Sequence, residues 1–379
     1  MDIRRIHFRT LLRSIASYQL QASSRQTMTL KDLIEELPKC ELHCHLEGTL
    51  EPEFYLELAR RHNVNVLYET PEEVRKAYQF RNLDSFLQLY YEGCNVLRTQ
   101  QDFYDLTYRY LRQCSQHDNL VHTEVFCDPQ SHTSRGIAFE TVLNGIHQAL
   151  DDGERDFGIT SCIIVCFLRH LSADDAMTTL DQVLTYRGQQ KGSNNINNCR
   201  IKGVGLDSSE LGNEPRKFQD VFRRAQEAGL LCCCHAGEEG PPSYIWGAIQ
   251  DLKVHRVDHG VRCLEDEALV DYLVQHQIPL TVCPLSNLKL AVVNDLRKHP
   301  LRAMLEAGLA ASIHSDDPAY FGGYITENYN ATAVALNLSA EEVVQLARNA
   351  VQGSFLEDDR KQALLAQIQT CYENHKHNE

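Results

Sequence analysis

The stretch that decides the fold comes early in the chain, where residues 37–48 read LPKCELHCHLEG. Its strand-like part, Cys40–His45, ends in ionisable side chains instead of a plain turn. Side chains alternate across a strand, so His43 and His45 point the same way and could share a metal ion. Seventeen histidines in 379 residues would give about one such pair by chance, so the pair alone carries little weight.

Seven further strand-like runs follow, most of them ending in the same polar fashion, and helix-like stretches separate them. This alternation predicts βα units, and eight parallel strands with intervening helices predict an α/β fold of the TIM (β/α)8 barrel type. The expected strands are Cys40–His45, Leu120–Asp128, Ile159–His170, Arg200–Asp207, Leu230–Glu238, His255–His259, Ile278–Asn287 and Leu309–Asp316. The expected helices include Phe139–Asp152, Ala173–Tyr186, Lys217–Ala228, Asp266–Gln275 and Leu301–Ala307.

The barrel is expected to form a single domain over residues 28–379, with extra helices at its C-terminal end. An aromatic-rich block, residues 71–116, predicts two or three helices inserted after the first strand, and such an insertion often forms a lid. Residues 188–199 are rich in glycine and asparagine and predict an exposed loop. Residues 1–27 are rich in arginine and resemble a mitochondrial presequence; the alternative is an untargeted extension or a misassigned start upstream of Met28.

Composition narrows the classes of partner. Acidic residues outnumber basic ones by 52 to 37, and a net charge of -15 disfavours nucleic acid and anionic membranes as partners. The apolar runs are too short to cross a bilayer. Fourteen cysteines in 379 residues are too few for a disulfide scaffold and indicate a reducing compartment. We therefore expect a cytoplasmic protein, also compatible with the nucleus, or a mitochondrial one if residues 1–27 are a presequence.

Metal-type ligands stand at several other strand ends, where barrels of this kind carry their active sites. His235 ends the fifth expected strand, with Glu238 close behind it; His259 ends the sixth, and Asp316 and Asp317 end the eighth. Found singly, each is more typical of a satisfied polar residue or a turn. Together they favour a catalytic metal site, because three histidines and one aspartate can hold a divalent ion and leave a position open for water.

Five segments carry a family resemblance. LPKCELHCHLEG, HAGEE, DHG, CPLSN and SDDP resemble the signature segments of the adenosine/adenine deaminase family of metal-dependent hydrolases, in the same order and over about residues 37–325. The resemblance implies a purine as small-molecule substrate and one Zn2+ ion per chain. It also implies that this ion is bound by His43, His45, His235 and Asp316.

The same resemblance implies that Glu238 is the proton donor and that His259 and Asp317 steer the attacking hydroxide and hold the purine. The chemistry is consistent with those roles. Zinc lowers the pKa of bound water to about 7, which supplies a nucleophile for C6 of the ring. A protonated Glu238 can give its proton to the ring nitrogen beside C6, which requires a raised pKa in a dry site. His259 can take the proton of the hydroxide or stabilise its charge, and the amino group leaves as ammonia.

The choice of purine depends on one departure. Nucleoside deaminases of the family typically have Leu-Asp-Gly after the two histidines, whereas this chain has Leu46-Glu47-Gly48. The longer carboxylate is expected to protrude into the space of a ribose, although a neutral exchange of acids is the alternative. Residues 128–136 and 316–324 resemble the fungal and bacterial adenine deaminase branch. Ser208 or Glu210 is expected either to contact the purine or to cap a helix.

The predicted activity is therefore hydrolysis of adenine to hypoxanthine and ammonia in purine salvage. A deaminase of adenosine or of N6-substituted adenine is the nearest alternative. A non-catalytic purine-binding protein on the same scaffold is the alternative from another class, and it would be expected to lack Glu238 or one of the metal ligands. This chain lacks none of them.

Overall fold

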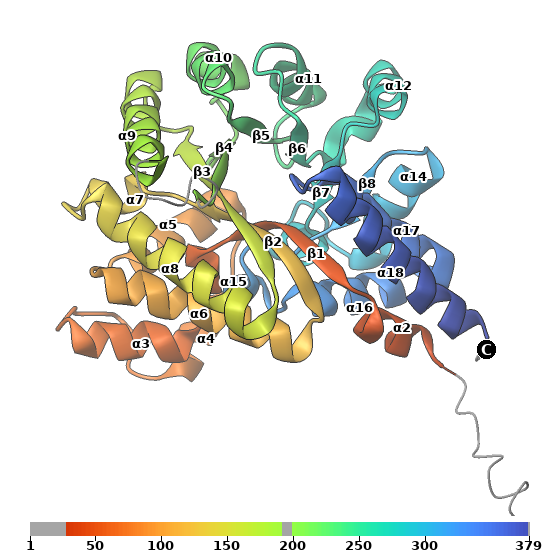
Figure 1. The fold of residues 1–379 in the computed structure, drawn as a ribbon, viewed down its shortest axis with the longest axis horizontal. Helices are drawn as coiled ribbons and strands as arrows, with labels where there is room; N and C mark the ends of the chain where they lie inside the picture. The colour runs from red at the N-terminus through yellow and green to blue at the C-terminus, as the bar shows by residue number, and fades with distance from the viewer. Residues whose placement is uncertain (1–27, 192–198, 378–379) are drawn as a thin grey trace, which may run out of the picture.

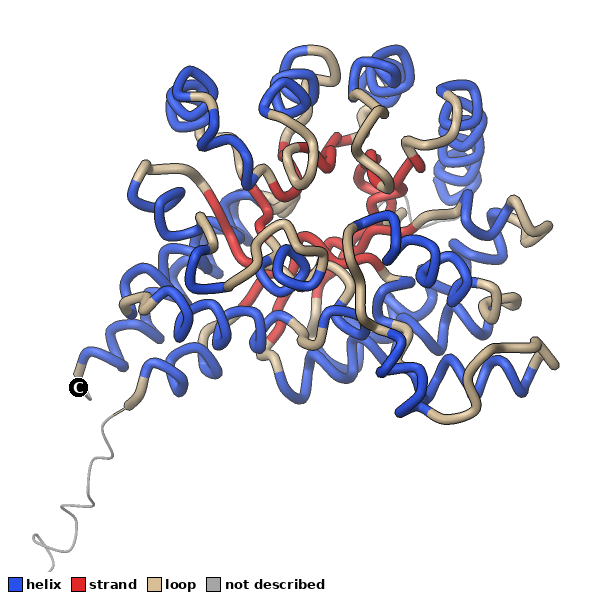
Figure 2. Tube along the Cα trace, turned by 180° about the vertical axis from the view of Figure 1, so that it is seen from behind, coloured by secondary structure: helices blue, strands red, loops and turns tan. Residues whose placement is uncertain are grey.

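The computed structural model describes residues 28–191 and 199–377, so the expectations for residues 1–27 fall outside the described residues. Eight parallel strands follow one another in chain order around a single sheet. The strands lie at the centre of the molecule and the helices surround them (Figures 1 and 2). The strands are β1 (Lys39–His45), β2 (Leu120–Cys127), β3 (Thr160–Leu168), β4 (Ile201–Asp207), β5 (Leu231–Ala236), β6 (Arg256–His259), β7 (Leu280–Val282) and β8 (Ala311–Ile313).

The two ends of this sheet meet beyond the last strand. His45 donates its backbone N–H to Asp316 O at 2.9 Å, and Asp316 donates to His43 O at 2.9 Å. Cys44 and Asp316 thereby form a parallel bridge between the first and last strand positions. The predicted TIM barrel is confirmed.

Helices alternate with the strands because the strands are apolar on both faces and must be covered outside the barrel. In β3, every residue from Cys162 to Leu168 is buried. Helices α8 to α12 and α14 follow β2 to β7, and α17 packs against β1 and β8. The helices after β2 are α7 (Gln130–Thr133), α8 (Phe139–Phe157), α9 (Ala173–Lys191), α10 (Gln219–Glu227), α11 (Pro242–Gln250), α12 (Glu267–His276), α13 (Pro284–Lys289), α14 (Leu301–Glu306), α15 (Pro318–Phe321), α16 (Ile325–Leu336), α17 (Ala340–Gly353) and α18 (Asp358–Lys376).

The segment between β1 and β2 is helical, as expected. It contains α3 (Pro52–Arg61), α4 (Pro71–Ala77), α5 (Leu83–Cys94) and α6 (Gln100–His117). Thr70, Asn82 and Thr99 cap the last three of these helices by accepting a backbone N–H of the first turn. Near the N-terminus, α2 (Leu30–Glu36) packs against α18 and α17. No helix in the described part of the chain is both long and apolar enough to cross a bilayer.

Several expected boundaries were wrong: α8 continues five residues past Asp152, to Phe157, and β8 covers only Ala311–Ile313 of the run Leu309–Asp316. The run Ile278–Asn287 is not one strand, because β7 ends at Val282 and α13 starts at Pro284, where the fixed φ of proline suits the first helical position. The expected loop at residues 188–199 starts too early, since α9 continues to Lys191. Tyr186 and Arg187 anchor this extension through Asn144 Oδ1 and Ala228 O.

Candidate active site

Four expected metal ligands meet at the closing seam of the barrel. Ligand atoms of His43, His45, His235 and Asp316 all lie within 4.8 Å of one another, and all four side chains are buried. His45 Nε2 lies 3.1 Å from His235 Nε2 and 3.4 Å from Asp316 Oδ1. His43 Nε2 lies 3.3 Å from the same carboxylate oxygen. The structure therefore brings together side chains from β1, β5 and the end of β8.

The hydrogen-bond partners of His43 fix its tautomer. Thr281 Oγ1 donates to Asp258 Oδ1 at 2.9 Å, so the hydroxyl oxygen accepts from His43 Nδ1–H, also at 2.9 Å. The lone pair of His43 consequently lies on Nε2, which has no hydrogen-bond partner among the described residues. A buried, unpaired nitrogen of this kind requires a ligand.

His235 and His45 are arranged in the same way. His235 Nδ1 lies 3.6 Å from Asp258 Oδ2, and His45 Nδ1 lies 3.6 Å from Asp207 Oδ2. Each carboxylate favours an Nδ1–H tautomer, which turns the lone pair of Nε2 toward the other ligands. Burial and the neighbouring His43 and His45 lower the pKa of His235, which keeps its imidazole neutral.

This donor set fits a tetrahedral cation. Bonds of about 2.0–2.1 Å to nitrogen and oxygen place neighbouring ligand atoms roughly 3.3–3.4 Å apart. The separations of 3.1, 3.3 and 3.4 Å between the four ligand atoms are close to that spacing. Three lone pairs and a carboxylate oxygen would repel one another without a positive charge between them, so the site is suited to a divalent metal.

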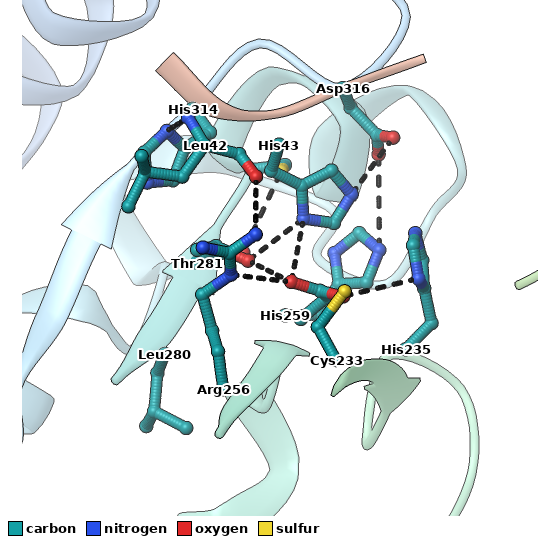
Figure 3. A network of polar contacts seen from close by, with 12 residues as sticks. Leu42, His43, Cys233, His235, Arg256, His259, Leu280, Thr281, His314 and Asp316 are labelled. Atoms are coloured by element: carbon teal, nitrogen blue, oxygen red, sulfur yellow. Dashed lines mark hydrogen bonds and ion pairs between the residues drawn. The ribbon is translucent and has the colours of Figure 1, made fainter. Parts of the chain in front are cut away.

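A buried ion network supports these ligands from the barrel interior (Figure 3). Arg256 Nε donates to Asp258 Oδ1 at 3.3 Å, and its Nη1 donates to Glu124 Oε2 at 2.6 Å. Arg256 Nη2 also donates to Leu42 O at 3.1 Å, which ties the network to β1. Arg256, Glu124 and Asp258 are fully buried, so their charges depend on one another. Arg256 thereby orients the carboxylate that faces His43 and His235.

The two expected proton-transfer residues lie next to the ligand cluster. His259 Nε2 lies 3.5 Å from Glu238 Oε2 and 3.9 Å from Asp316 Oδ2. Burial and then Asp316 raise the pKa of Glu238 well above its usual value, so this carboxyl holds a proton at neutral pH. Burial lowers the pKa of His259 to about 3, so its imidazole is neutral.

Asp317, expected to hold the purine, also lies at this cavity. Its Oδ1 has no hydrogen-bond partner among the described residues, and burial together with Asp316 raises its pKa well above the usual value. A Cβ on Gly48 would lie 2.0 Å from Asp317 Oδ1 and 2.7 Å from its Cα. Only glycine at position 48 leaves room for Asp317.

Glu210 has a different role from either one expected. It accepts backbone N–H bonds from four consecutive residues, Gly237 to Gly240, at 2.7, 3.1, 2.8 and 2.7 Å. The carboxylate neither caps the next helix nor lines the cavity. It gathers the loop that carries Glu238, and its charge is one of the causes of the raised pKa of Glu238. No spacing within one segment predicts this contact, because it joins the ends of β4 and β5.

The Glu47 side chain does not point where it was expected to, into the space of a ribose. Arg135 donates to His132 Nδ1 at 2.8 Å, so His132 Nε2–H donates to Glu47 Oε1 at 2.9 Å. The same oxygen accepts the backbone N–H of Asp128 at 3.2 Å. Glu47 is therefore turned toward the end of β2 and is not among the residues that line the cavity.

The cavity opens beside the ligand cluster. Ser208 lies in its wall, where its hydroxyl forms hydrogen bonds with Tyr91 and His170, and its expected contact with the purine stays a prediction. Asp128 and Asp207 also line the cavity; neither was singled out from the sequence. The other lining residues are Leu83, Phe86, Leu87, Tyr90, Leu290 and Phe321, together with the six acidic and histidine side chains His45, His235, Glu238, His259, Asp316 and Asp317.

A barrel with a buried metal-type cluster and a protonated carboxyl beside it defines a class of metal-dependent hydrolases. The profile of the family described as adenosine deaminase matches residues 38–371, and the chain belongs to this family. It is 51% identical over 341 residues to the adenine deaminase of Acinetobacter baylyi, covering 90% of this chain and 99% of the relative.

Two solved structures extend the comparison. The adenine deaminase of Arthrobacter aurescens superposes with a TM-score of 0.85 at 46% identity, over 89% of this chain and 99% of that one. An amidohydrolase from Burkholderia ambifaria, determined with bound Zn, superposes with a TM-score of 0.81 at 25% identity, over 91% and 93% of the two chains.

Proposed function

We propose that this protein is an adenine deaminase that hydrolyses adenine to hypoxanthine and ammonia with one zinc ion per chain. The observation that carries the proposal is the convergence of three imidazole lone pairs and the Asp316 carboxylate on one point, with Glu238 alongside. Relatives named adenine deaminase at about half identity over nearly their whole length support the choice of substrate.

The metal would be held by His43, His45, His235 and Asp316, and the donor set suits zinc because nitrogen and carboxylate ligands are its usual partners. When bound, zinc acidifies water and supplies a nucleophile at neutral pH. The zinc bound in the Burkholderia amidohydrolase supports the same choice of ion.

The remaining steps fall to the side chains of this chain. Glu238, protonated because it is buried beside Asp316, gives its proton to the ring nitrogen next to C6. His259, neutral and within 3.5 Å of Glu238 Oε2, orients the attacking water and accepts its proton. Asp317 holds a proton as well, so it can donate to a ring nitrogen and fix the purine.

Helix α5 acts as a lid in this proposal. Leu83, Phe86, Leu87, Tyr90 and Tyr91 all come from this helix and line the cavity. Its first turn contacts the loop of the acid, since Leu83 N–H donates to Glu239 Oε1 at 3.4 Å. An aromatic and aliphatic cover excludes water, which keeps Glu238 protonated and favours free bases of small size. The fourteen free cysteines support a reducing compartment such as the cytoplasm.

Two measurements test the function. Steady-state rates on adenine, adenosine, AMP and N6-methyladenine are expected to give the greatest kcat/KM for adenine; a greater value for adenosine would overturn the choice of substrate. The Glu238→Gln variant is expected to retain zinc and lose turnover, because an amide cannot supply the proton. Glu239→Gln is the matched control in the same loop. A Glu238→Gln protein that deaminates at the wild-type rate would contradict the role of Glu238 as acid.

A further inference from the structure

One buried cation beside the site has no part in the proposed chemistry. Arg169 follows β3 directly and is 0% exposed. Its guanidinium forms no ion pair with a carboxylate of the described residues and donates to backbone carbonyl oxygens instead. Burying a charge without a counter-ion costs free energy. The carbonyl groups that accept from Arg169 therefore indicate what this side chain is for.

One of these carbonyl groups belongs to an expected metal ligand. Arg169 Nη1 donates to His235 O at 2.6 Å, which joins the end of β3 to the end of β5. The backbone N–H of Arg169 donates to Asp207 O at 3.0 Å, so the intervening strand β4 is tied to the same residue. The guanidinium thereby fixes the backbone of β5 at the residue whose side chain enters the ligand cluster.

The other carbonyl group belongs to the turn that carries Glu210. Arg169 Nε and Nη2 both donate to Asn213 O, at 2.9 and 2.7 Å. Asn213 N–H donates to Glu210 O at 3.1 Å, and Asn213 Nδ2 donates to Ser209 O at 3.0 Å. Arg169 therefore holds the turn from which the Glu210 side chain extends.

Residues 235–240 consequently lie between two buried opposite charges. Arg169 binds the carbonyl group of the first residue of this segment, and the Glu210 carboxylate binds the N–H groups of the last four. Glu210 is 1% exposed and also forms no ion pair within the described ranges. A Cβ on Gly240 would lie 2.5 Å from Glu210 Oε1, so glycine at this position permits the close approach of the carboxylate.

We infer that Arg169 is a positioning residue of the active site and that, together with Glu210, it fixes the backbone of residues 235–240. The spacing between His235 and Glu238 depends on that backbone. The inference rests on the proposed function and deepens it, because it names a further residue on which a metal ligand and the acid depend. Loss of either charge frees the segment at one end, so the second loss should add little. The two residues are therefore expected to be energetically coupled, as residues that share partners are.

Two measurements on Arg169→Met test the inference. Its zinc affinity, measured by competition with a chromogenic chelator, is expected to fall about tenfold, because groups that orient metal ligands are worth about 10- to 100-fold in affinity. Its kcat on adenine is expected to fall roughly 100-fold with KM changed less than about threefold, because a displacement of about 1 Å removes transition-state contacts. Arg169→Lys keeps the charge and can reach one of the two carbonyl oxygens, so it should recover about tenfold of the lost kcat.

Arg200→Met is the matched control at the other end of the barrel. Arg200 also donates to a backbone carbonyl, Ser161 O at 3.2 Å, and it pairs with Asp151 and Glu154. The variant should unfold at lower urea concentration and keep the wild-type kcat and zinc affinity. It thereby separates a general loss of stability from a loss of position.

The double variant Arg169→Met/Glu210→Gln tests the coupling. Its kcat is expected to equal roughly that of the slower single variant, because both substitutions free the same segment. A loss equal to the product of the two single losses overturns the inference, and so does an Arg169→Met protein with wild-type kcat and zinc affinity. If Arg169→Met does not fold, Arg169→Lys replaces it in both comparisons under the same criteria. If the wild-type enzyme does not deaminate adenine, the proposed function fails instead, and zinc affinity still tests the role of Arg169.

Discussion

The four N–H bonds received by Glu210 make a strong prediction about the Glu210→Gln variant. A glutamine can turn its carbonyl oxygen toward the three donors that Oε2 now accepts, from Glu238, Glu239 and Gly240. Its NH2 group then faces the N–H of Gly237, which donates to Oε1 at 2.7 Å in the wild-type protein. The exchange therefore leaves one buried donor unpaired and removes the charge from three other bonds.

The magnitude follows from these losses. An unpaired buried donor costs about 1–3 kcal/mol, and loss of charge weakens each remaining bond by a further fraction. We expect the free energy of unfolding to fall by about 3 kcal/mol, which corresponds to a decrease in Tm of roughly 4 °C for a domain of this size. Because the loop carries Glu238, a displacement of about 1 Å should lower kcat by roughly 100-fold. Zinc content should not change, because the metal ligands lie outside the loop.

The assay combines urea unfolding, metal analysis and steady-state kinetics on adenine. Glu239→Gln is the control, since this neighbouring carboxylate accepts only one long bond, from Leu83 at 3.4 Å, and should cost under about 1 kcal/mol. If Glu210→Gln unfolds at the wild-type midpoint and keeps the wild-type kcat, Glu210 does not position the acid.

Two further predictions concern the metal ligands and the buried thiols. Asp258→Asn should weaken zinc binding about 10- to 100-fold, measured by competition with a chromogenic chelator, because the amide no longer draws the Nδ1–H groups of His43 and His235; unchanged affinity would contradict this role. Burial raises the pKa of the thiols of Cys94, Cys127 and Cys233 well above the usual value, so the folded chain keeps protons that the unfolded chain releases above about pH 8.5. The stability associated with these protons is fully present below that pH and is lost as the pH rises, by about 1.4 kcal/mol per pH unit for each thiol. The urea midpoint in reducing buffer should therefore fall between pH 8 and 9.5, and a constant midpoint would refute the linkage.

The barrel and the positions of its metal-type residues could be predicted from the sequence because both are local properties. An apolar run followed by an ionisable residue marks a strand and its C-terminal end, and the fold itself brings those ends together. The expected strand that differs most from the structure is Ile278–Asn287, because Cys283 to Leu285 continue the apolar pattern across the start of α13. Hydrophobicity alone does not separate a buried strand from a short buried helix.

The support of the site could not be predicted in the same way. Asp258, Thr281 and Arg256 act on His43 through register between neighbouring strands, which no spacing within one segment reveals. Glu47 was recognised as a departure, but the direction of its carboxylate depends on His132, 85 positions away in the chain. Long-range contacts of this kind cannot be read from a local sequence pattern.

The closing seam of the barrel connects stability with chemistry. His259 and Asp316 adopt φ values of 64° and 63°, a left-handed conformation that costs non-glycine residues about 1–2 kcal/mol each. At Asp316 this conformation accompanies the two backbone bonds to His43 and His45 that close the sheet, and it accompanies the approach of the carboxylate to both imidazoles at 3.3 and 3.4 Å. The backbone strain and the repulsion among the ligands are offset only when a cation lies between the ligands. Part of the free energy of metal binding therefore stabilises the closure of the barrel. The metal-free protein should therefore lose structure first where β1 meets the end of β8, and amide hydrogen exchange of His45 and Asp316 should report that opening before any other strand pair exchanges.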